Sequence, residues 1–277
     1  MLYDVLSGYV MDSIIAPASI GEITLINRMA HNVDATDSIL ILDRGFGYFS
    51  TCKNLMYQKF NLCMRITTSQ SLFAKTVMQN DSADFIAEWI PSDGEKITCK
   101  KYGLDINPIK VRVTKILLHT GVTELLVSTL FDMNAVSIKD MQELYQLRWT
   151  VEEGFKKLKP KMKLEQFGCK RYEGVYQEFY AHIFMMNLVS VIGSDTEEMI
   201  FNKTKHRKHP YKYNWQNAFL YVRDSFINLL NSIDPIEFLE KIMDSIAASL
   251  IAVKKGRHFV RDTDGKRRRA GYSPCYK

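Results

Sequence analysis

The sequence lacks the features that mark secreted, zinc-stabilised and membrane proteins. Its five cysteines are scattered without CxxC spacing, which argues against a structural zinc site and against a disulfide framework. No apolar run reaches the roughly 18 residues of a membrane-spanning helix, and no basic stretch precedes the first apolar residues. There is no internal repeat or low-complexity block. The cytoplasm is therefore the expected compartment, and membrane association is not expected.

Apolar and basic residues are what the sequence has in quantity. Apolar residues make up 46% of the 277 positions, enough for a substantial core in one large domain or two. The formal net charge is +6. Mild basicity of this kind permits a polyanionic partner such as nucleic acid, but many soluble proteins share it. Composition is thus compatible with DNA binding without selecting it.

The N-terminal region predicts an α/β arrangement with a carboxylate at a strand end. Residues 2–6 and 9–15 predict a hairpin, and residues 20–33 have apolar side chains at helical spacing. The aliphatic run 39–42 then leads directly into Asp43. This pattern predicts a strand buried on both faces, with Asp43 at the sheet edge where open α/β sheets bind ligands. An Asp shortly before a Gly is also ordinary in a turn or a helix cap, so position alone leaves both interpretations open.

Residues 144–159 predict one helix with two different faces. Ser137 is expected to cap this helix together with Asp140, and Pro160 to end or kink it. One narrow face is apolar and is expected to pack on a core. The members of that face are Leu144, Leu147, Val151, Phe155 and Leu158. A second face carries Tyr145, Arg148, Glu152, Lys156 and Lys159. A carboxylate among cations could act on phosphate, although Glu and Lys four residues apart are also the commonest solvated pair on a helix.

Two motifs resemble those of a known family. The spacing Tyr145-x2-Arg148-x3-Glu152-x6-Lys159 resembles the signature of bacterial insertion-sequence transposases of the DDE class, in which the Glu is the third catalytic carboxylate. The string LILDRGFG resembles the segment around the second catalytic Asp, which closes a central strand of a ribonuclease H-like sheet. Phe46 stands where Tyr is more usual in that family. The resemblance therefore aligns Asp43 and Glu152 with two of the three catalytic carboxylates.

The resemblance implies a DNA transposase that cleaves and transfers DNA strands during transposition of an insertion sequence. The family uses two divalent cations, Mg²⁺ or Mn²⁺, and the resemblance makes Asp43 and Glu152 their catalytic ligands. It also makes four side chains DNA-binding: Tyr145, Arg148, Lys156 and Lys159. The implied partners are double-stranded DNA, as transposon ends and target, and a second copy of the chain in a synaptic homodimer. The implied location is the bacterial cytoplasm, at the nucleoid when DNA is bound.

The expected fold is a ribonuclease H-like mixed sheet flanked by helices, interrupted by a β-rich insertion and followed by a helical, basic C-terminal region. The core is assigned to 1–68 and 134–200, and the insertion to 69–133. Within the insertion, β-like runs are expected at 85–90, 96–101, 109–118 and 124–131. The insertion either helps to hold the DNA end, as the resemblance implies, or is an extension with no separate role. C-terminal helices are expected over 201–253, and a basic, disordered tail over 254–277.

One catalytic carboxylate of the family has no counterpart in the sequence. The only acidic residues in the two expected N-terminal strands are Asp4 and Asp12. Neither precedes a Gly, as the family's first catalytic Asp does. We therefore expect Met1 to follow the first catalytic strand, so that the chain is truncated and does not cut DNA alone. The alternative is a catalytically inactive remnant that binds DNA or the full-length transposase as an inhibitor. An unrelated basic α/β protein is a third possibility.

Overall fold

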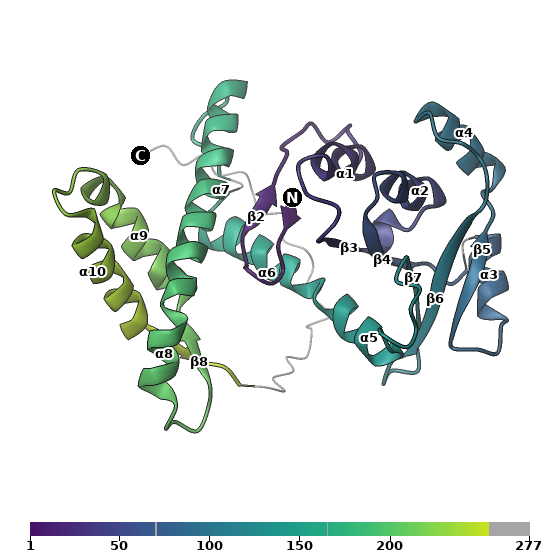
Figure 1. The fold of residues 1–277 in the computed structure, drawn as a ribbon. Helices are drawn as coiled ribbons and strands as arrows, with labels where there is room; N and C mark the ends of the chain where they lie inside the picture. The colour runs from purple at the N-terminus through teal and green to yellow at the C-terminus, as the bar shows by residue number, and fades with distance from the viewer. Residues whose placement is uncertain (70, 165, 255–277) are drawn as a thin grey trace, which may run out of the picture. The chain divides into compact units, whose positions relative to one another are not determined.

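The computed structural model describes residues 1–69, 71–164 and 166–254, and the chain forms two compact units (Figure 1). Unit 1 comprises Met1–Leu2 and Ala16–Val151. Unit 2 comprises Tyr3–Ile15 and, of the described residues, those from Glu152 to Lys254. Apart from Lys254, the expected basic tail over 254–277 lies outside the described residues.

The centre of unit 1 is a five-stranded mixed sheet. Its strands in spatial order are β3 (Ile39–Leu42), β4 (Asn61–Ile66), β7 (Thr123–Ser128), β6 (Ile109–Leu117) and β5 (Asp84–Trp89). β3 and β4 run parallel, and the other neighbours are antiparallel. The helix between β3 and β4 is the crossover that a parallel pair requires. The predicted mixed sheet flanked by helices is therefore confirmed.

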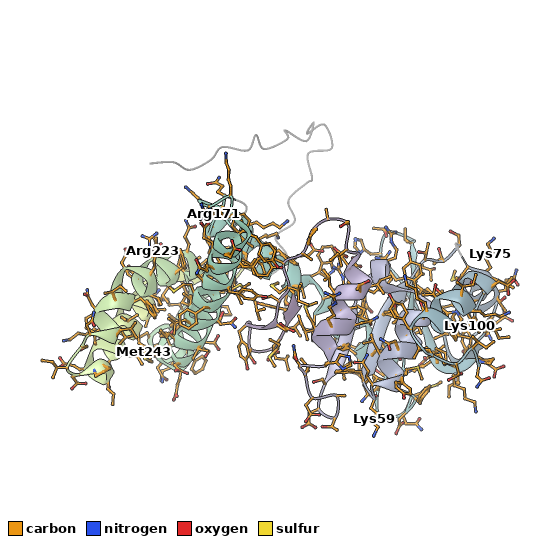
Figure 2. The ribbon with its side chains drawn as sticks, turned by 90° about the horizontal axis from the view of Figure 1, so that it is seen from above. Lys59, Lys75, Lys100, Arg171, Arg223 and Met243 are labelled. Atoms are coloured by element: carbon orange, nitrogen blue, oxygen red, sulfur yellow. The ribbon has the colours of Figure 1, made fainter. Side chains whose placement is uncertain are left out.

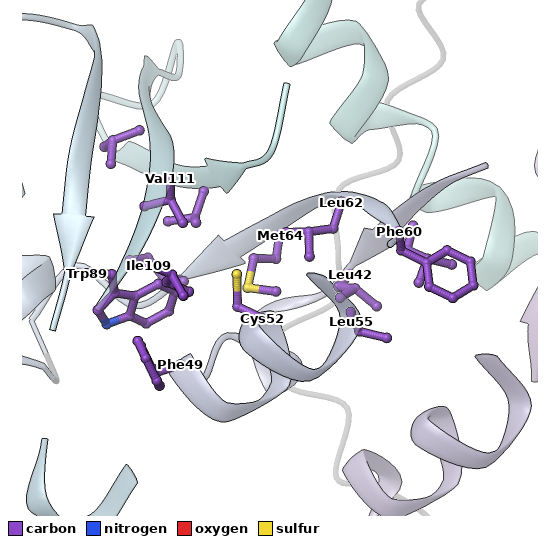
Figure 3. Close-up of a cluster of buried hydrophobic side chains, with 14 of the residues drawn as sticks. Leu42, Phe49, Cys52, Leu55, Phe60, Leu62, Met64, Trp89, Ile109 and Val111 are labelled. Carbon is purple, nitrogen blue, oxygen red and sulfur yellow. The ribbon is translucent and has the colours of Figure 1, made fainter. Parts of the chain in front are cut away.

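Helices cover both faces of this sheet. The helical elements of unit 1 are α1 (Glu22–Ala30), the short 3₁₀ turn η1 (Arg44–Phe46), α2 (Phe49–Tyr57), α3 (Leu72–Met78), α4 (Asp93–Lys101) and α5 (Ile138–Gln146). Charged side chains such as Lys75 on α3 and Lys100 on α4 are exposed (Figure 2). α2 turns Phe49, Cys52 and Leu55 towards the sheet, where they form the main core with residues of β4 and β6 (Figure 3).

The second face of the sheet packs against α5. Cys63 of β4 and Leu126 of β7 form a smaller core there with Met141 and Tyr145 of α5. β4 and β7 are consequently buried on both faces, as central strands of a sheet with helices on each face are expected to be. β3 differs from the prediction, because Ile39 is 43% exposed while Leu40 and Leu42 are buried. β3 lies at the end of the sheet, so its second face is only partly covered.

The segment predicted as a β-rich insertion, 69–133, extends the central sheet. Its strands β5, β6 and β7 join the sheet through the pairing of β7 with β4, so they do not form a sheet of their own. The bounds at 69 and 133 stay a prediction. The β-like run expected at 96–101 is wrong, because these residues belong to α4. Ser92 accepts from the Glu95 N–H, and acidic residues fill the first turn of α4, a start signal that outweighs the β-prone side chains.

The single helix predicted up to Lys159 is wrong, because it is broken after Gln146. α5 ends there, and α6 spans Trp149–Lys156. At the break, the N–H groups of Leu147, Arg148 and Thr150 donate to carbonyls three residues back, which tightens the turn and shifts the helical register. A π-helical turn, η2 (Lys157–Lys161), follows α6. The predicted start is confirmed, since Ser137 and Asp140 form a reciprocal capping box.

Unit 2 is mainly helical. Its elements from the long helix onward are α7 (Tyr172–Asp195), α8 (Glu197–Thr204), β8 (Tyr211–Tyr213), α9 (Trp215–Leu230), α10 (Pro235–Ala248) and β9 (Leu250–Ala252). β8 and β9 pair antiparallel. The predicted N-terminal hairpin is present as β1 (Leu2–Tyr3) and β2 (Val10–Asp12). The Asn187 side chain of α7 binds both the N–H and the carbonyl of Val10, which attaches β2 to the helix.

Gly193→Ala should destabilise unit 2. A Cβ atom at this position of α7 would lie 2.5 Å from Cζ and 2.7 Å from the hydroxyl of Tyr213, which is closer than real Cβ contacts. The Tyr213 ring is planar and partly buried in β8, so we expect a loss of about 1–3 kcal/mol from overpacking. Urea denaturation followed by circular dichroism measures the loss.

Gly94→Ala provides the matched control for Gly193→Ala. Gly94 lies in α4 with open space around its Cα, so the same exchange should stabilise the protein by up to about 1 kcal/mol through helix propensity. Combining Gly193→Ala with Tyr213→Leu should recover part of the loss. Equal effects of Gly193→Ala with and without Tyr213→Leu would show that the ring is not the obstacle.

Candidate active site

Asp43 directly follows β3 and presents its carboxylate at the carboxyl end of the strand. It precedes η1, whose first hydrogen bond joins the Phe46 N–H to the Asp43 carbonyl at 2.9 Å. The Asp43 side chain makes no capping hydrogen bond to this turn, and it is 54% exposed. The sequence left open whether Asp43 caps this turn or presents its carboxylate to a ligand. The side chain does not cap the turn. Its oxygens are directed away from its own backbone turn.

Gly47 allows the chain to leave this turn close to β4. A Cβ atom at Gly47 would lie 2.7 Å from the carbonyl oxygen of Arg65 in β4 and 3.2 Å from that of Arg44. Both obstacles are backbone atoms, so neither could move aside cheaply. The glycine after the DRGF segment therefore has a local steric reason, because it keeps the turn that carries Asp43 against the neighbouring strand.

Tyr145 and Arg148 come from the region of the helix break and lie beside Asp43. The Tyr145 hydroxyl is positioned to donate a long hydrogen bond of 3.5 Å to Asp43 Oδ1, across 102 positions of sequence. Arg148 Nε lies 3.7 Å from the same oxygen. The guanidinium carbon of Arg148 also lies 4.6 Å from the centre of the Trp149 ring, which limits its freedom. The structure thus brings three of the candidate residues together.

The local electrostatics keep Tyr145 a donor. Burial, and then the charge of Asp43, raise the pKa of the Tyr145 phenol, while Arg148 and Arg65 act in the opposite direction. The phenol is consequently protonated at neutral pH and can only offer its hydrogen to the carboxylate. The sequence placed Tyr145 on a partly exposed face, but the residue is buried, because it packs with Met141 against Cys63 of β4 and Leu126 of β7.

Arg65 and Glu124 are site neighbours that sequence reasoning missed. Arg65 of β4 and Glu124 of β7 form an ion pair at 2.7 Å, and both charges act on Tyr145. The available signal was a charged residue inside the otherwise buried strand 61–66. Such a residue needs a partner on a neighbouring strand, but the sequence does not reveal which strand that is.

The remaining candidates belong to unit 2. Glu152 lies in the first turn of α6, and its convergence with Asp43 stays a prediction. Lys156 pairs with Glu153, three residues earlier, and both side chains are largely exposed, which is the bland arrangement of a solvated helix face. Lys159 Nζ lies 5.9 Å from the centre of the Phe155 ring. The DNA-binding roles of Lys156 and Lys159 stay predictions.

The chemistry of Asp43 fits a divalent cation. Its carboxylate is more than half exposed, and its two contacts, at 3.5 and 3.7 Å, are long, so its hard oxygen atoms are available to a cation such as Mg²⁺. Across residues 1–69, 71–164 and 166–254, no group of three or more His, Cys, Asp or Glu side chains is placed to hold a metal. Asp43 thus presents one exposed carboxylate at the carboxyl end of β3.

A comparison with protein families decides the assignment. The family model described as the transposase DDE domain matches residues 1–188, well over half of the chain. The chain belongs to the DDE transposase family. This confirms the resemblance that the two motifs suggested, and the mixed sheet with flanking helices is consistent with the ribonuclease H-like fold of a DDE domain. A search of curated proteins gives no match to the chain.

Family membership makes this DDE transposase chain a relative of enzymes that perform phosphoryl transfer on DNA, with divalent metals as the general cofactor. The matched region contains Asp43, Tyr145, Arg148 and Glu152. None of the helices within the described parts of the chain combines the length and the apolar character needed to cross a membrane.

Proposed function

We propose that this protein is a DNA transposase that cleaves DNA strands at the ends of an insertion sequence and transfers them to a target. Family membership supports the class of reaction. The observation that carries the proposal is the contact of Asp43 with Tyr145 and Arg148. The two motifs that suggested the family lie about a hundred positions apart in sequence, yet Tyr145 and Arg148 of one motif both approach Oδ1 of Asp43 in the other.

The proposed roles follow from the chemistry of each side chain. Asp43 and Glu152 would hold the divalent cations, Mg²⁺ or Mn²⁺, which supply charge stabilisation and an activated oxygen nucleophile when bound. Tyr145 orients the Asp43 carboxylate through its hydroxyl. Arg148 attracts a DNA phosphate and offsets the repulsion between that phosphate and the carboxylates. Lys159, and more weakly Lys156, contact the DNA backbone.

The outer edge of β3 is the proposed position of the third carboxylate. Among the described strands β3 pairs only with β4, so the backbone groups along its other side are available to a further strand. We propose that an Asp-bearing strand pairs there and completes the ligand set. DNA ends and target are the proposed substrates, and a homodimer within the bacterial nucleoid is the proposed assembly.

The second candidate function is that of a catalytically inactive transposase remnant, which binds DNA or the full-length transposase as an inhibitor. This alternative shares the DNA contacts of the first proposal and lacks only the cleavage.

The test is strand cleavage with Glu152→Gln and a matched control. The substrate is a supercoiled plasmid carrying the ends of the element that encodes the chain, with Mg²⁺ or Mn²⁺ as the only divalent cation. The 277-residue chain is assayed with and without the segment encoded upstream of Met1. We expect metal-dependent nicking when that segment is present, loss of nicking in Glu152→Gln, and retention in Glu153→Gln, because Glu153 faces Lys156 in an exposed pair.

Three other outcomes would change the proposal. Nicking that survives Glu152→Gln would remove Glu152 from the catalytic set. Nicking by the chain alone that Asp4→Ala or Asp12→Ala abolishes would place the third carboxylate in the N-terminal hairpin. DNA binding without nicking by either form of the protein would favour the inhibitor.

A further inference from the structure

A concave basic surface lies in unit 2. It is a hollow of about 450 Å³ between α8, the loop that follows it and β8. These two elements lie side by side at the lower end of α7 in Figure 1. Its cationic lining consists of Lys205, Arg207, Lys208 and Lys212, with His209 between them. All four Lys and Arg side chains are exposed.

The positive charge of this hollow is largely uncompensated. Within the described residues, none of its four Lys and Arg side chains has a carboxylate partner within 4.0 Å, and Glu197 is the only acidic residue in the lining. Lys203 differs, because it lies just outside the lining and pairs with Asp244 at 3.9 Å. The guanidinium carbon of Arg207 lies 4.8 Å from the centre of the Tyr211 ring, a cation–π contact that orders the cation without neutralising it.

A second group of cations adjoins the hollow through Lys212. Lys157 and Lys161 of η2 place their ammonium groups 5.4 and 5.7 Å from the centre of the Trp215 ring. Burial, and then the charges of Lys212 and Lys161, lower the pKa of Lys157 to about 8, while Glu153 acts in the opposite direction. Trp215 begins α9 two residues after the end of β8, so the ring that Lys157 and Lys161 approach is held beside the strand that carries Lys212. The two groups of cations therefore adjoin each other.

We propose that this surface, the basic track, binds the phosphate backbone of duplex DNA. The track consists of Lys157, Lys161, Lys205, Arg207, Lys208 and Lys212. The choice of DNA among polyanions rests on the proposed function. Several exposed cations spread over a strand, a loop and a helical turn match an extended polyanion with regularly spaced phosphates. A single small anion would instead need a compact and enclosed set of donors.

The first test removes three cations of the track and measures how DNA affinity depends on salt. The variant is Lys157→Gln combined with Arg207→Gln and Lys212→Gln in the full chain, and the probe is a short labelled duplex of arbitrary sequence. EDTA keeps metal chemistry out of the measurement. Each lost phosphate contact should lower the slope of log K against log salt by about 0.9, so the triple variant should lose roughly 2.7.

The matched control removes three cations that already have carboxylate partners. Lys203, Arg223 and Lys241 pair with Asp244, Asp224 and Glu237, and Arg223 is visible on α9 in Figure 2. Their exchange to Gln changes the net charge of unit 2 by the same amount, and the salt slope should stay within error of the unaltered chain. Equal losses in both triple variants would overturn the proposal, because net charge alone would then explain the binding. Circular dichroism checks that both variants fold.

A second readout follows the proton of Lys157. A phosphate beside Lys157 favours the charged ammonium, so DNA binding should raise the pKa of Lys157 from about 8 and take up protons at and above that pH. Calorimetry in buffers of different ionisation enthalpy measures this uptake. Lys157→Arg keeps the charge but cannot titrate, so it should bind DNA nearly as well and lose the uptake. An uptake that is absent from the unaltered chain, or unchanged in Lys157→Arg, would contradict a phosphate at Lys157.

These measurements are independent of cleavage. Asp43→Asn and Glu152→Gln should leave the salt slope in EDTA unchanged, since neither residue belongs to the track. If the track variant has a reduced salt slope but the protein never nicks DNA, the basic track is supported and the proposed enzyme activity is rejected. If the protein nicks DNA and the track variant has an unaltered salt slope, the enzyme activity is supported and the basic track is rejected.

Discussion

Arg112→Ala should lower the free energy of unfolding by about 3–5 kcal/mol, the cost of breaking one side of a buried ion pair. Arg112 of β6 is fully buried. Its Nε and Nη2 donate to the two carboxylate oxygens of Asp84 at 2.8 and 2.6 Å. The same guanidinium donates to the carbonyls of Leu130 and Val136 at 2.9 and 2.7 Å. It therefore ties β5 and β6 to the segment that leads into α5.

Removal of Arg112 leaves the largely buried Asp84 carboxylate with the Thr114 hydroxyl as its remaining side-chain donor, and it takes a donor from the part-buried carbonyls of Leu130 and Val136. Urea denaturation measures the loss, and Lys110→Ala is the control, because Lys110 is an exposed cation on the same strand. A double exchange of Arg112→Met with Asp84→Leu should recover much of the stability, since apolar replacement of a whole buried pair is often neutral. A loss below about 1 kcal/mol in Arg112→Ala would show that water reaches Asp84 readily.

Asp43→Asn should abolish metal-dependent nicking and leave stability nearly unchanged. The amide has the shape of the carboxylate but not its charge, so it is a much weaker ligand for a hard cation. The side chain is 54% exposed and makes only long contacts to Tyr145 and Arg148, so its exchange should alter the unfolding free energy by no more than about 0.5 kcal/mol.

Two measurements test Asp43→Asn. The first is nicking, assayed with and without the segment encoded upstream of Met1, and the second is Mn²⁺ binding followed by electron paramagnetic resonance. Asp37→Asn is the control, because Asp37 is exposed and lies just ahead of the same strand. Retained Mn²⁺ binding in Asp43→Asn would mean that the cation is held elsewhere. A large loss of stability would mean that Asp43 is a structural residue.

The elements that were predicted correctly are those that depend on residues close together in the sequence. The aliphatic run ending on Asp43 became β3, and Ser137 with Asp140 became a capping box, since each depends on residues only a few positions apart. The break after Gln146 was not predictable in this way. Before the break, Met141 and Tyr145 pack against β4 and β7, which are distant in sequence, so the pattern of residues 144–159 alone does not contain this constraint.

Charged residues in strands show a second limit of sequence reasoning. Arg112 and Asp84 meet because β5 and β6 pair with Asp84 opposite Thr114, and a shift of one residue would point one of the two charges to the other face. Arg65 and Glu124 depend in the same way on the register of β4 and β7. The sequence shows that such charges are unusual within apolar runs, but only the register shows which of them form pairs.

The way in which β7, β6 and β5 continue the sheet beyond β4 bears on protein engineering. A chain shortened by residues 69–133 would keep only β3 and β4 of the described sheet, a parallel pair too small to be stable alone. It would also lose Leu125, Leu126 and Val127, which are fully buried and contribute to the cores on both faces. The segment therefore cannot be excised or exchanged as an independent module. Circular permutation or loop grafting in this protein should be attempted in the connections between strands and not at the ends of that segment.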